Sequence, residues 1–194
     1  TFENYISHMS ADIPRERCLW GLESIYSFQT AAYCYDWQNN HRLMNTLWWT
    51  GRKAPHDIPG LIGVGLRLST TTDSFNWSAT PLLLTSRLLE FFDDSEPTHR
   101  YYQQAKDFLS FYEKNCDEKF IPIHNVLADH APPQGVQRQQ RDPGVIARMT
   151  FFESQRRFAA MAATLGETKD AAHARRFAEK ILAAIMEDYD AQNH

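Results

Sequence analysis

The strongest constraint on the fold is a pair of long helical repeats near the end of the chain, separated by a link of three residues. Residues 145–165 and 169–189 both carry apolar side chains at intervals of three and four, the spacing of one face of a helix. Gly166 is suited to end the first helix, because glycine readily adopts the left-handed backbone that closes many helices. A link this short makes the two helices antiparallel neighbours. The sequence therefore predicts a helical hairpin here.

The same spacing predicts two further hairpins earlier in the chain. Their helices cover residues 13–37 with 41–50, and residues 81–92 with 98–115. At the start of the second hairpin, Thr80 is suited to cap the helix and Pro81 to occupy its first position. Glu96 lies where the N-terminus of the return helix favours a negative charge. We therefore expect an all-α fold of stacked antiparallel helical hairpins.

Two long irregular spans, residues 52–77 and 117–142, separate these hairpins and are interrupted by prolines and glycines. The pattern over residues 61–72 permits at most one short β-hairpin. Loops of this length inside a compact domain are usually functional. If the hairpins lie side by side, both spans gather on a common edge and enclose a hollow.

The composition excludes several classes of protein. Lys and Arg number 20 against 24 Asp and Glu, and the net charge of −4 lacks the basic excess of a nucleic-acid-binding domain. No apolar run approaches the roughly 18 residues of a membrane-spanning helix. The 194 residues suit a single helical-hairpin domain or a part of a larger one. The three cysteines contain no CxxC pair and mildly favour a reducing, cytoplasmic compartment.

Three stretches resemble the (α/α)6 six-hairpin toroids of trehalase-like glycoside hydrolases. They are residues 78–83 (SATPLL), residues 92–94 (FDD) before 101–109 (YYQQAKDFL), and residues 158–166 (FAAMAATLG) before 171–181 (AAHARRFAEKI). The resemblance implies an α/α toroid whose long loops line a sugar-binding cleft on one rim, where two carboxylates hydrolyse the glycosidic bond. Because the chain is shorter than a full toroid, the resemblance implies either a compact relative or a fragment of a larger ring.

Two aspartates are the candidate catalytic carboxylates. Glycosidic cleavage needs one carboxylic acid held protonated and a second carboxylate as base or nucleophile. The resemblance places the acid near Asp129, whose apolar neighbours at 126–128 are suited to raise its pKa by desolvation. Asp73 is the candidate second carboxylate. The alternative for both is an aspartate that only shapes a loop or turn.

Candidate sugar-binding residues lie in the same two spans and beside them. Trp49, Trp77 and Phe75 carry flat rings that match the apolar face of a pyranose, and we expect an exposed tryptophan beside a loop. His124 and His130 complete the set. Their H-x5-H spacing lacks the tighter arrangement and third ligand of a zinc site, so we expect neither a metal nor another cofactor.

Two functions remain open at this point. The first is a carbohydrate-active helical domain that cleaves a glycosidic bond by acid/base chemistry, with Asp129 as the proton donor. The second is a non-enzymatic helical protein, of the adaptor or toxin-neutralising kind, that binds a protein partner. A second carboxylate roughly 5–10 Å from Asp129 across a cleft favours the first. Trp49 or Trp77 in an exposed apolar patch favours the second.

Overall fold

The computed structural model describes residues 25, 28, 32, 33, 41, 45, 75–123 and 143–193. The helices of the two long described ranges are α4 (Phe75–Ser78), α5 (Thr80–Phe92), α6 (Glu96–Lys114), α7 (Pro143–Thr164) and α8 (Thr168–Asn193). Most of the first predicted hairpin and the possible β-hairpin over 61–72 lie outside the described residues.

α5 and α6 form the first described hairpin. The chain leaves α5 at Asp93, which has a φ of +52° and donates its N–H to the carbonyl of Leu89 at 3.0 Å. The side chain of Asp94 then accepts a hydrogen bond of 3.1 Å from the N–H of Glu96, which satisfies one of the free amides at the start of α6. The return helix therefore begins at Glu96, two residues before the boundary that the apolar spacing predicts.

α7 and α8 form the second described hairpin, and Gly166 closes α7 as predicted. Gly166 has a φ of +77°, and its N–H donates to the carbonyl of Ala163 at 3.1 Å. The N–H of Glu167 donates to the carbonyl of Ala162 at 2.9 Å. These two bonds form a Schellman closure, in which a residue in the left-handed conformation reverses the chain.

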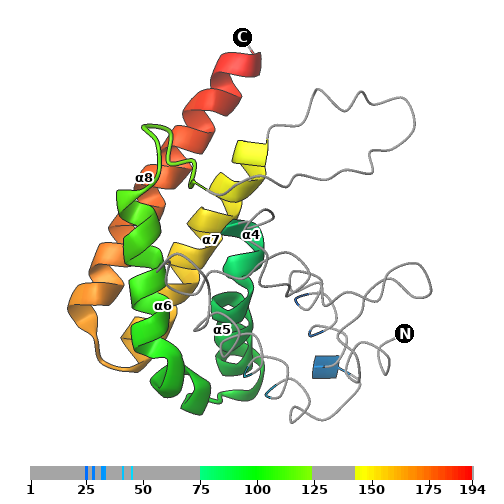
Figure 1. Cartoon of the computed structure of the whole chain (residues 1–194), viewed down its shortest axis with the longest axis vertical. Helices are drawn as coiled ribbons and strands as arrows, with labels where there is room; N and C mark the ends of the chain where they lie inside the picture. The colour runs from blue at the N-terminus through cyan, green and yellow to red at the C-terminus, as the bar shows by residue number, and fades with distance from the viewer. Residues whose placement is uncertain are drawn as a thin grey trace.

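The two hairpins stack side by side with α7 as the central element (Figure 1). α7 packs against α4, α5, α6 and α8. α6 and α8 are also joined directly, because Tyr102 Oη and Lys106 Nζ both donate to the carboxylate of Asp170 at 2.6 Å. Figure 1 shows α5 and α7 running in the same direction, so both hairpin turns lie at one end of the array. The prediction of an all-α fold of stacked antiparallel hairpins is confirmed.

Aromatic side chains dominate the core of this array. The largest fully buried side chains are Tyr112, Phe28, Phe75, Phe108, Phe151, Leu82 and Leu84. Each large apolar side chain stabilises the fold by about 1.5–3 kcal/mol when fully buried. Phe28, within the first predicted helix, packs edge-on against Phe91 and Phe92 with ring centroids 6.1 and 6.4 Å apart. The described part of the first predicted hairpin therefore contacts the end of α5.

The start of the second predicted hairpin differs from the prediction. Helix begins at Phe75, inside the expected irregular span, and Ala79 keeps helical backbone angles between α4 and α5. The N–H of Ala79 donates to the carbonyl of Phe75 at 2.9 Å, and no side chain caps α5. The prediction that Thr80 is an N-cap is therefore wrong. Thr80 and Pro81 follow four residues that are already helical, so the free amides that a cap would satisfy lie further upstream.

The residues after α6 form a compact turn. Cys116 and Pro122 make an isolated antiparallel bridge. This bridge is the longest β-structure in the ranges that the structure describes. Asp117 Oδ1 accepts hydrogen bonds from the N–H groups of Lys119 and Ile121 at 3.0 and 2.7 Å. The first part of the second irregular span is thus an ordered turn. None of the helices in the described ranges is long and apolar enough to cross a bilayer.

Candidate functional site

The described ends of the two long spans meet at one end of the array. Phe75 follows the first span directly, Tyr112 lies in the last turn of α6 before the second span, and Phe151 lies in α7 after it. The ring of Phe75 is 4.6 Å from that of Tyr112 and 5.3 Å from that of Phe151, between centroids. The hairpin turns lie at the opposite end (Figure 1). Both spans are therefore anchored at one edge, as expected for a common rim.

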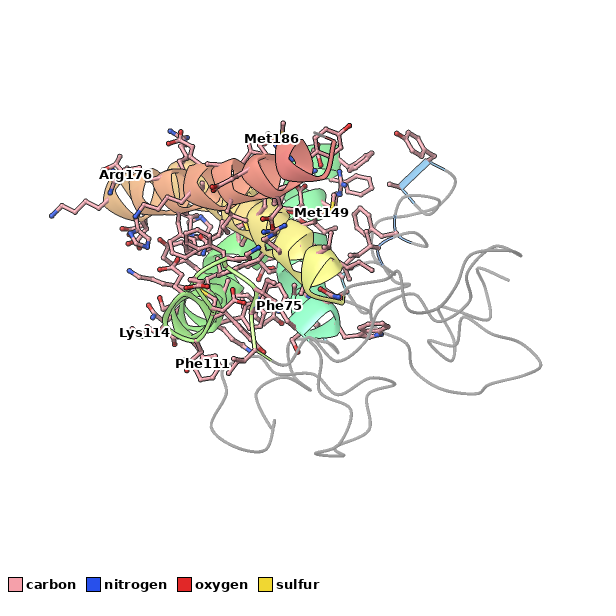
Figure 2. All side chains as sticks on the ribbon, turned by 90° about the horizontal axis from the view of Figure 1, so that it is seen from above. Phe75, Phe111, Lys114, Met149, Arg176 and Met186 are labelled. Atoms are coloured by element: carbon pink, nitrogen blue, oxygen red, sulfur yellow. The ribbon has the colours of Figure 1, made fainter. Side chains whose placement is uncertain are left out.

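Phe75 belongs to the core and not to an open sugar site. Its side chain has 0% exposure, and its ring stacks on Phe108 at 5.7 Å while its edges meet Tyr112 and Phe151. In Figure 2 it lies among the helices. This corrects the prediction that Phe75 stacks on a sugar, because the ring has no free face to offer.

Trp77 is also buried, with an exposure of 9%. The expectation of an exposed tryptophan at this position is therefore wrong, and Trp77 does not form an exposed apolar patch. Its indole Nε1–H is buried and has no hydrogen-bond partner among the residues that the structure describes. A buried indole N–H usually finds an acceptor, so this donor is an unusual feature at the end of the array where both spans attach.

Two neighbours of Trp77 share this property. Both amide atoms of Asn76 and the hydroxyl oxygen of Thr80 are buried and have no hydrogen-bond partner within the described ranges. Asn76 is 1% exposed and Thr80 is 0% exposed. Neither residue is among the binding residues that the sequence predicts. Their signal in the sequence is a pair of polar residues, four positions apart, in a segment that is otherwise mainly apolar.

An ionic cluster fixes the turn that leads into the second span. Asp188 of α8 accepts hydrogen bonds from Arg148 of α7 at 2.7 Å and from Lys119 of the turn at 3.1 Å. These two cations lower the pKa of Asp188 from its ordinary value. Phe120 of the same turn packs edge-on against Phe177 of α8 at 5.5 Å. The stem of the second span is thus held against the α7–α8 hairpin.

A family comparison identifies the type of domain. All 194 residues match the family model described as the bacterial alpha-L-rhamnosidase 6 hairpin glycosidase domain. The chain belongs to this family. Membership confirms the resemblance to toroid glycoside hydrolases and makes the chain a glycosidase-type helical domain.

Two solved structures share the fold of this family member. The alpha-L-rhamnosidase from Dictyoglumus thermophilum matches with a TM-score of 0.76 over 95% of this chain, at 18% sequence identity. The Streptomyces avermitilis alpha-L-rhamnosidase complexed with L-rhamnose matches with a TM-score of 0.68 over 89% of this chain, at 21% identity. The chain spans only 22% and 16% of the lengths of those two proteins. No curated protein matches the chain significantly.

The other predicted site residues of this glycosidase-type domain lie outside the described residues. They are Asp129, Asp73, Trp49, His124 and His130. Their roles stay predictions, and only the ends of the segments that carry them are placed. Within the ranges that the structure describes, no group of three His, Cys, Asp or Glu side chains is arranged to hold a metal ion.

Proposed function

We propose that this domain takes part in the hydrolysis of a glycosidic bond, at the end of the array where the two long spans attach. The observation that carries the proposal is the contact of Phe75 with Tyr112 and Phe151, which anchors both spans to one aromatic cluster. Asp73 is two residues from Phe75, and Asp129 is six residues from Ile123. At about 3.5 Å per extended residue, the chain limits the Cα atom of Asp73 to about 7 Å from that of Phe75 and the Cα atom of Asp129 to about 21 Å from that of Ile123.

In this proposal the two carboxylates have different roles. Asp129 donates a proton to the leaving oxygen, because its apolar neighbours favour the protonated acid. Asp73 acts as the base or nucleophile. Carboxyl groups about 5–5.5 Å apart indicate retention of configuration, and about 6.5–9.5 Å indicates inversion. Trp49, His124 and His130 then line the sugar-binding site.

The substrate class follows from the names of the relatives. Both matched structures are alpha-L-rhamnosidases, and one is complexed with L-rhamnose. We extend that substrate class to this domain and propose alpha-L-rhamnosides. Because the chain covers about a fifth of those relatives or less, we further propose that it forms one helical domain that supplies part of a six-hairpin ring.

The test compares two substrates that differ in their leaving group. For Asp129→Asn, we expect kcat on an alkyl alpha-L-rhamnoside to fall by about 10²–10⁴, the usual contribution of a general acid. The loss should be much smaller on the 4-nitrophenyl rhamnoside, because nitrophenolate leaves without protonation. Asp73→Asn should lower kcat on both substrates.

Asp107→Asn is the matched control for these two variants. Asp107 is an exposed carboxylate of α6 whose side chain accepts a hydrogen bond from Gln103, and the control should leave both rates unchanged. Equal rates for Asp129→Asn and Asp107→Asn on both substrates would remove Asp129 from the mechanism. If the complete ring that contains the wild-type domain neither hydrolyses nor binds rhamnosides, the proposed function is contradicted.

An exposed apolar strip on the last hairpin keeps the second hypothesis, a protein partner, open. Its members are Val145, Ile146, Met149, Leu182, Met186 and Tyr189. Contiguous exposed apolar patches mark protein interfaces. Trp77 does not belong to this strip, so a partner would bind here and not at the tryptophan that the sequence suggests. A substitution in this strip that abolishes partner binding but leaves sugar hydrolysis unchanged would separate the two functions.

A further inference from the structure

We propose that Phe120 is a positioning residue, which acts through Phe177 and Phe151 to fix the stem of the second span relative to the end of the first span. The stem is residues 115–123, the described part of the chain that follows α6. This inference rests on the proposed function, because the relative position of the two spans matters for hydrolysis only if both contribute to the site. It adds Phe120 and Phe177 to the residues on which the reaction depends.

Four aromatic rings form a continuous row from one span to the other. The ring of Phe120 meets that of Phe177 in α8 edge-on, with centroids 5.5 Å apart. Phe177 lies 5.5 Å from Phe151 of α7, and Phe151 lies 5.3 Å from Phe75, which follows the first span directly. Rings about 4.5–7 Å apart attract each other in addition to the effect of the area that they bury. The stem is therefore coupled, through two helices, to the end of the first span.

The backbone of the stem is a short hairpin with Phe120 in its turn. The N–H of Phe120 donates to the carbonyl of Asp117 at 3.0 Å, and the N–H of Asp117 donates to the carbonyl of Ile121 at 3.1 Å. A further backbone hydrogen bond of 3.1 Å joins the two ends of the stem, from residue 123 to residue 115. A contact made by Phe120 therefore restrains the whole stem.

Phe120 occupies a backbone conformation that its residue type disfavours. Its φ is +60°, in the left-handed region that residues with a Cβ atom rarely adopt, and the residue that follows a hairpin turn in this conformation is usually glycine. The other left-handed non-glycine residue of the described ranges is Asp93, and aspartate tolerates that conformation. Strained residues persist where surrounding contacts hold them, and they gather at functional sites. Here the ring contact with Phe177 offsets the strain, and a glycine would not provide it.

The ion pair of the same turn is the weaker attachment. Lys119 Nζ lies 3.1 Å from Asp188 Oδ1, but the side chain of Lys119 is 57% exposed. Exposed ion pairs are screened by solvent and salt and contribute little. Phe120 is half-buried against the core, where its ring contact is not screened. We therefore assign the positioning role to Phe120 and not to Lys119.

Displacement of the stem should affect the proposed acid more than the stability of the fold. Ile123 ends the described stem, and Asp129 lies six residues further along the chain. A misplacement of about 1 Å can lower a catalytic rate about 100-fold. When a general acid is misplaced, the substrates whose leaving group needs protonation lose the most rate. A loss of folded protein lowers the rates on all substrates equally, so the ratio of two rates reports position and not stability.

Phe120→Leu and Phe92→Leu are matched variants for the test, made in the complete ring that contains this domain. Both phenylalanines are half-buried, and Phe92 meets Phe28 edge-on at the far end of α5, beside the hairpin turn. For Phe120→Leu, we expect kcat on an alkyl alpha-L-rhamnoside to fall at least about tenfold more than kcat on the 4-nitrophenyl rhamnoside. Phe92→Leu should leave the ratio of the two rates unchanged. Phe120→Tyr, which retains the ring, should keep the wild-type ratio.

Phe120→Gly separates the role of the ring from that of the backbone. Glycine suits a φ of +60°, so a residue that only shapes the turn could be replaced by glycine without loss of protection from hydrogen exchange. We expect instead that amide exchange over residues 115–123 becomes at least about tenfold faster, because the ring that holds the stem is lost. Lys119→Met should accelerate this exchange by a smaller factor.

The outcomes separate this inference from the proposed function. If the complete ring with the wild-type domain hydrolyses no rhamnoside, both are overturned. If that ring is active and Phe120→Leu keeps the wild-type ratio of the two rates, positioning by Phe120 is overturned while the proposed function stands. Unchanged or slower exchange in Phe120→Gly would overturn the restraint of the stem by the ring.

Discussion

At Gly166 the backbone has a φ of +77°, a conformation that L-amino acids with a side chain rarely adopt. A Cβ atom built at this position meets nothing within 4 Å. The requirement for glycine is therefore conformational and not a matter of space. This single residue permits the reversal that makes α7 and α8 neighbours.

Substitution at Gly166 tests this distinction. Gly166→Ala should lower the free energy of unfolding by about 1 kcal/mol, because alanine is strained in the left-handed conformation. Gly166→Asn should cost less, since asparagine tolerates that conformation better. Urea unfolding measures both, with Glu167→Ala at the exposed neighbouring position as the control. Equal stability of Gly166→Ala and wild type would show that the turn can relax.

At the scale of elements, an arginine links the two parallel helices. Arg157 of α7 donates to Glu90 of α5 and to Glu153 of its own helix, both at 2.6 Å. Burial raises the pKa of both carboxyl groups, but hydrogen bonds from Arg157 and its neighbouring arginines outweigh burial, and both pKa values are lowered. The linkage therefore stabilises the fold while the carboxylates are charged.

The effect of Arg157→Met on stability should depend on pH, because the pKa values of Glu90 and Glu153 are lowered. A carboxyl group whose pKa is lowered by folding stabilises the folded state at any pH above its pKa in the unfolded chain, which is near 4.5. This stabilisation is lost as the pH falls through the pKa of the folded state. We expect Arg157→Met to lower the free energy of unfolding by about 1 kcal/mol at pH 7, a modest figure because Glu90 is partly exposed and screened by solvent. The difference from wild type should shrink towards pH 3.

Arg156→Met is the control for this measurement. Arg156 is 54% exposed as a side chain and pairs with Glu153 within α7, whereas Arg157 is 13% exposed and also reaches α5. Arg156→Met should lower the free energy of unfolding by only about a few tenths of a kcal/mol. An effect of Arg157→Met that is equal to the control, or unchanged between pH 7 and pH 3, would contradict the role of the interhelical pair.

The elements also show what could be predicted from the sequence. Periodicity and the glycine signal at Gly166 are local properties, so the two described hairpins and the closure of α7 were predictable. The burial of Phe75 and Trp77 depends on α6 and α7, which are distant in sequence, and an aromatic beside a loop can be core or surface. Thr80 and Pro81 match the pattern that often begins a helix. The helix does not begin there, because the residues from Phe75 onward are already helical.

At the scale of the whole molecule, the last hairpin exposes an apolar strip to solvent. Met149 of α7 is 56% exposed and Met186 of α8 is 48% exposed, and Figure 2 labels both. In the 194-residue chain alone the strip is open to solvent.

Charge placed on this strip should reduce its exposed apolar surface. We expect the double variant Met149→Lys with Met186→Lys to bind less of the hydrophobic dye ANS than wild type and to be more soluble in ammonium sulfate. Because both side chains are exposed, the melting temperature should change little. Ala160→Lys with Ala183→Lys adds the same charge at exposed alanines of the same helices. Equal dye binding by the two double variants would show that the strip is not the dye-binding surface.

Because both hairpin turns lie at one end of the array, that end can be chemically modified without altering the opposite end. Residues 166 and 167 are exposed and form the turn between α7 and α8, at the end of the array opposite α4 and the stems of both spans. In a variant with Cys18, Cys34 and Cys116 replaced by serine, a cysteine introduced as Glu167→Cys would tether the protein to a sensor chip by this end. Every immobilised copy would then present the opposite end to the flowing solution, in one uniform orientation.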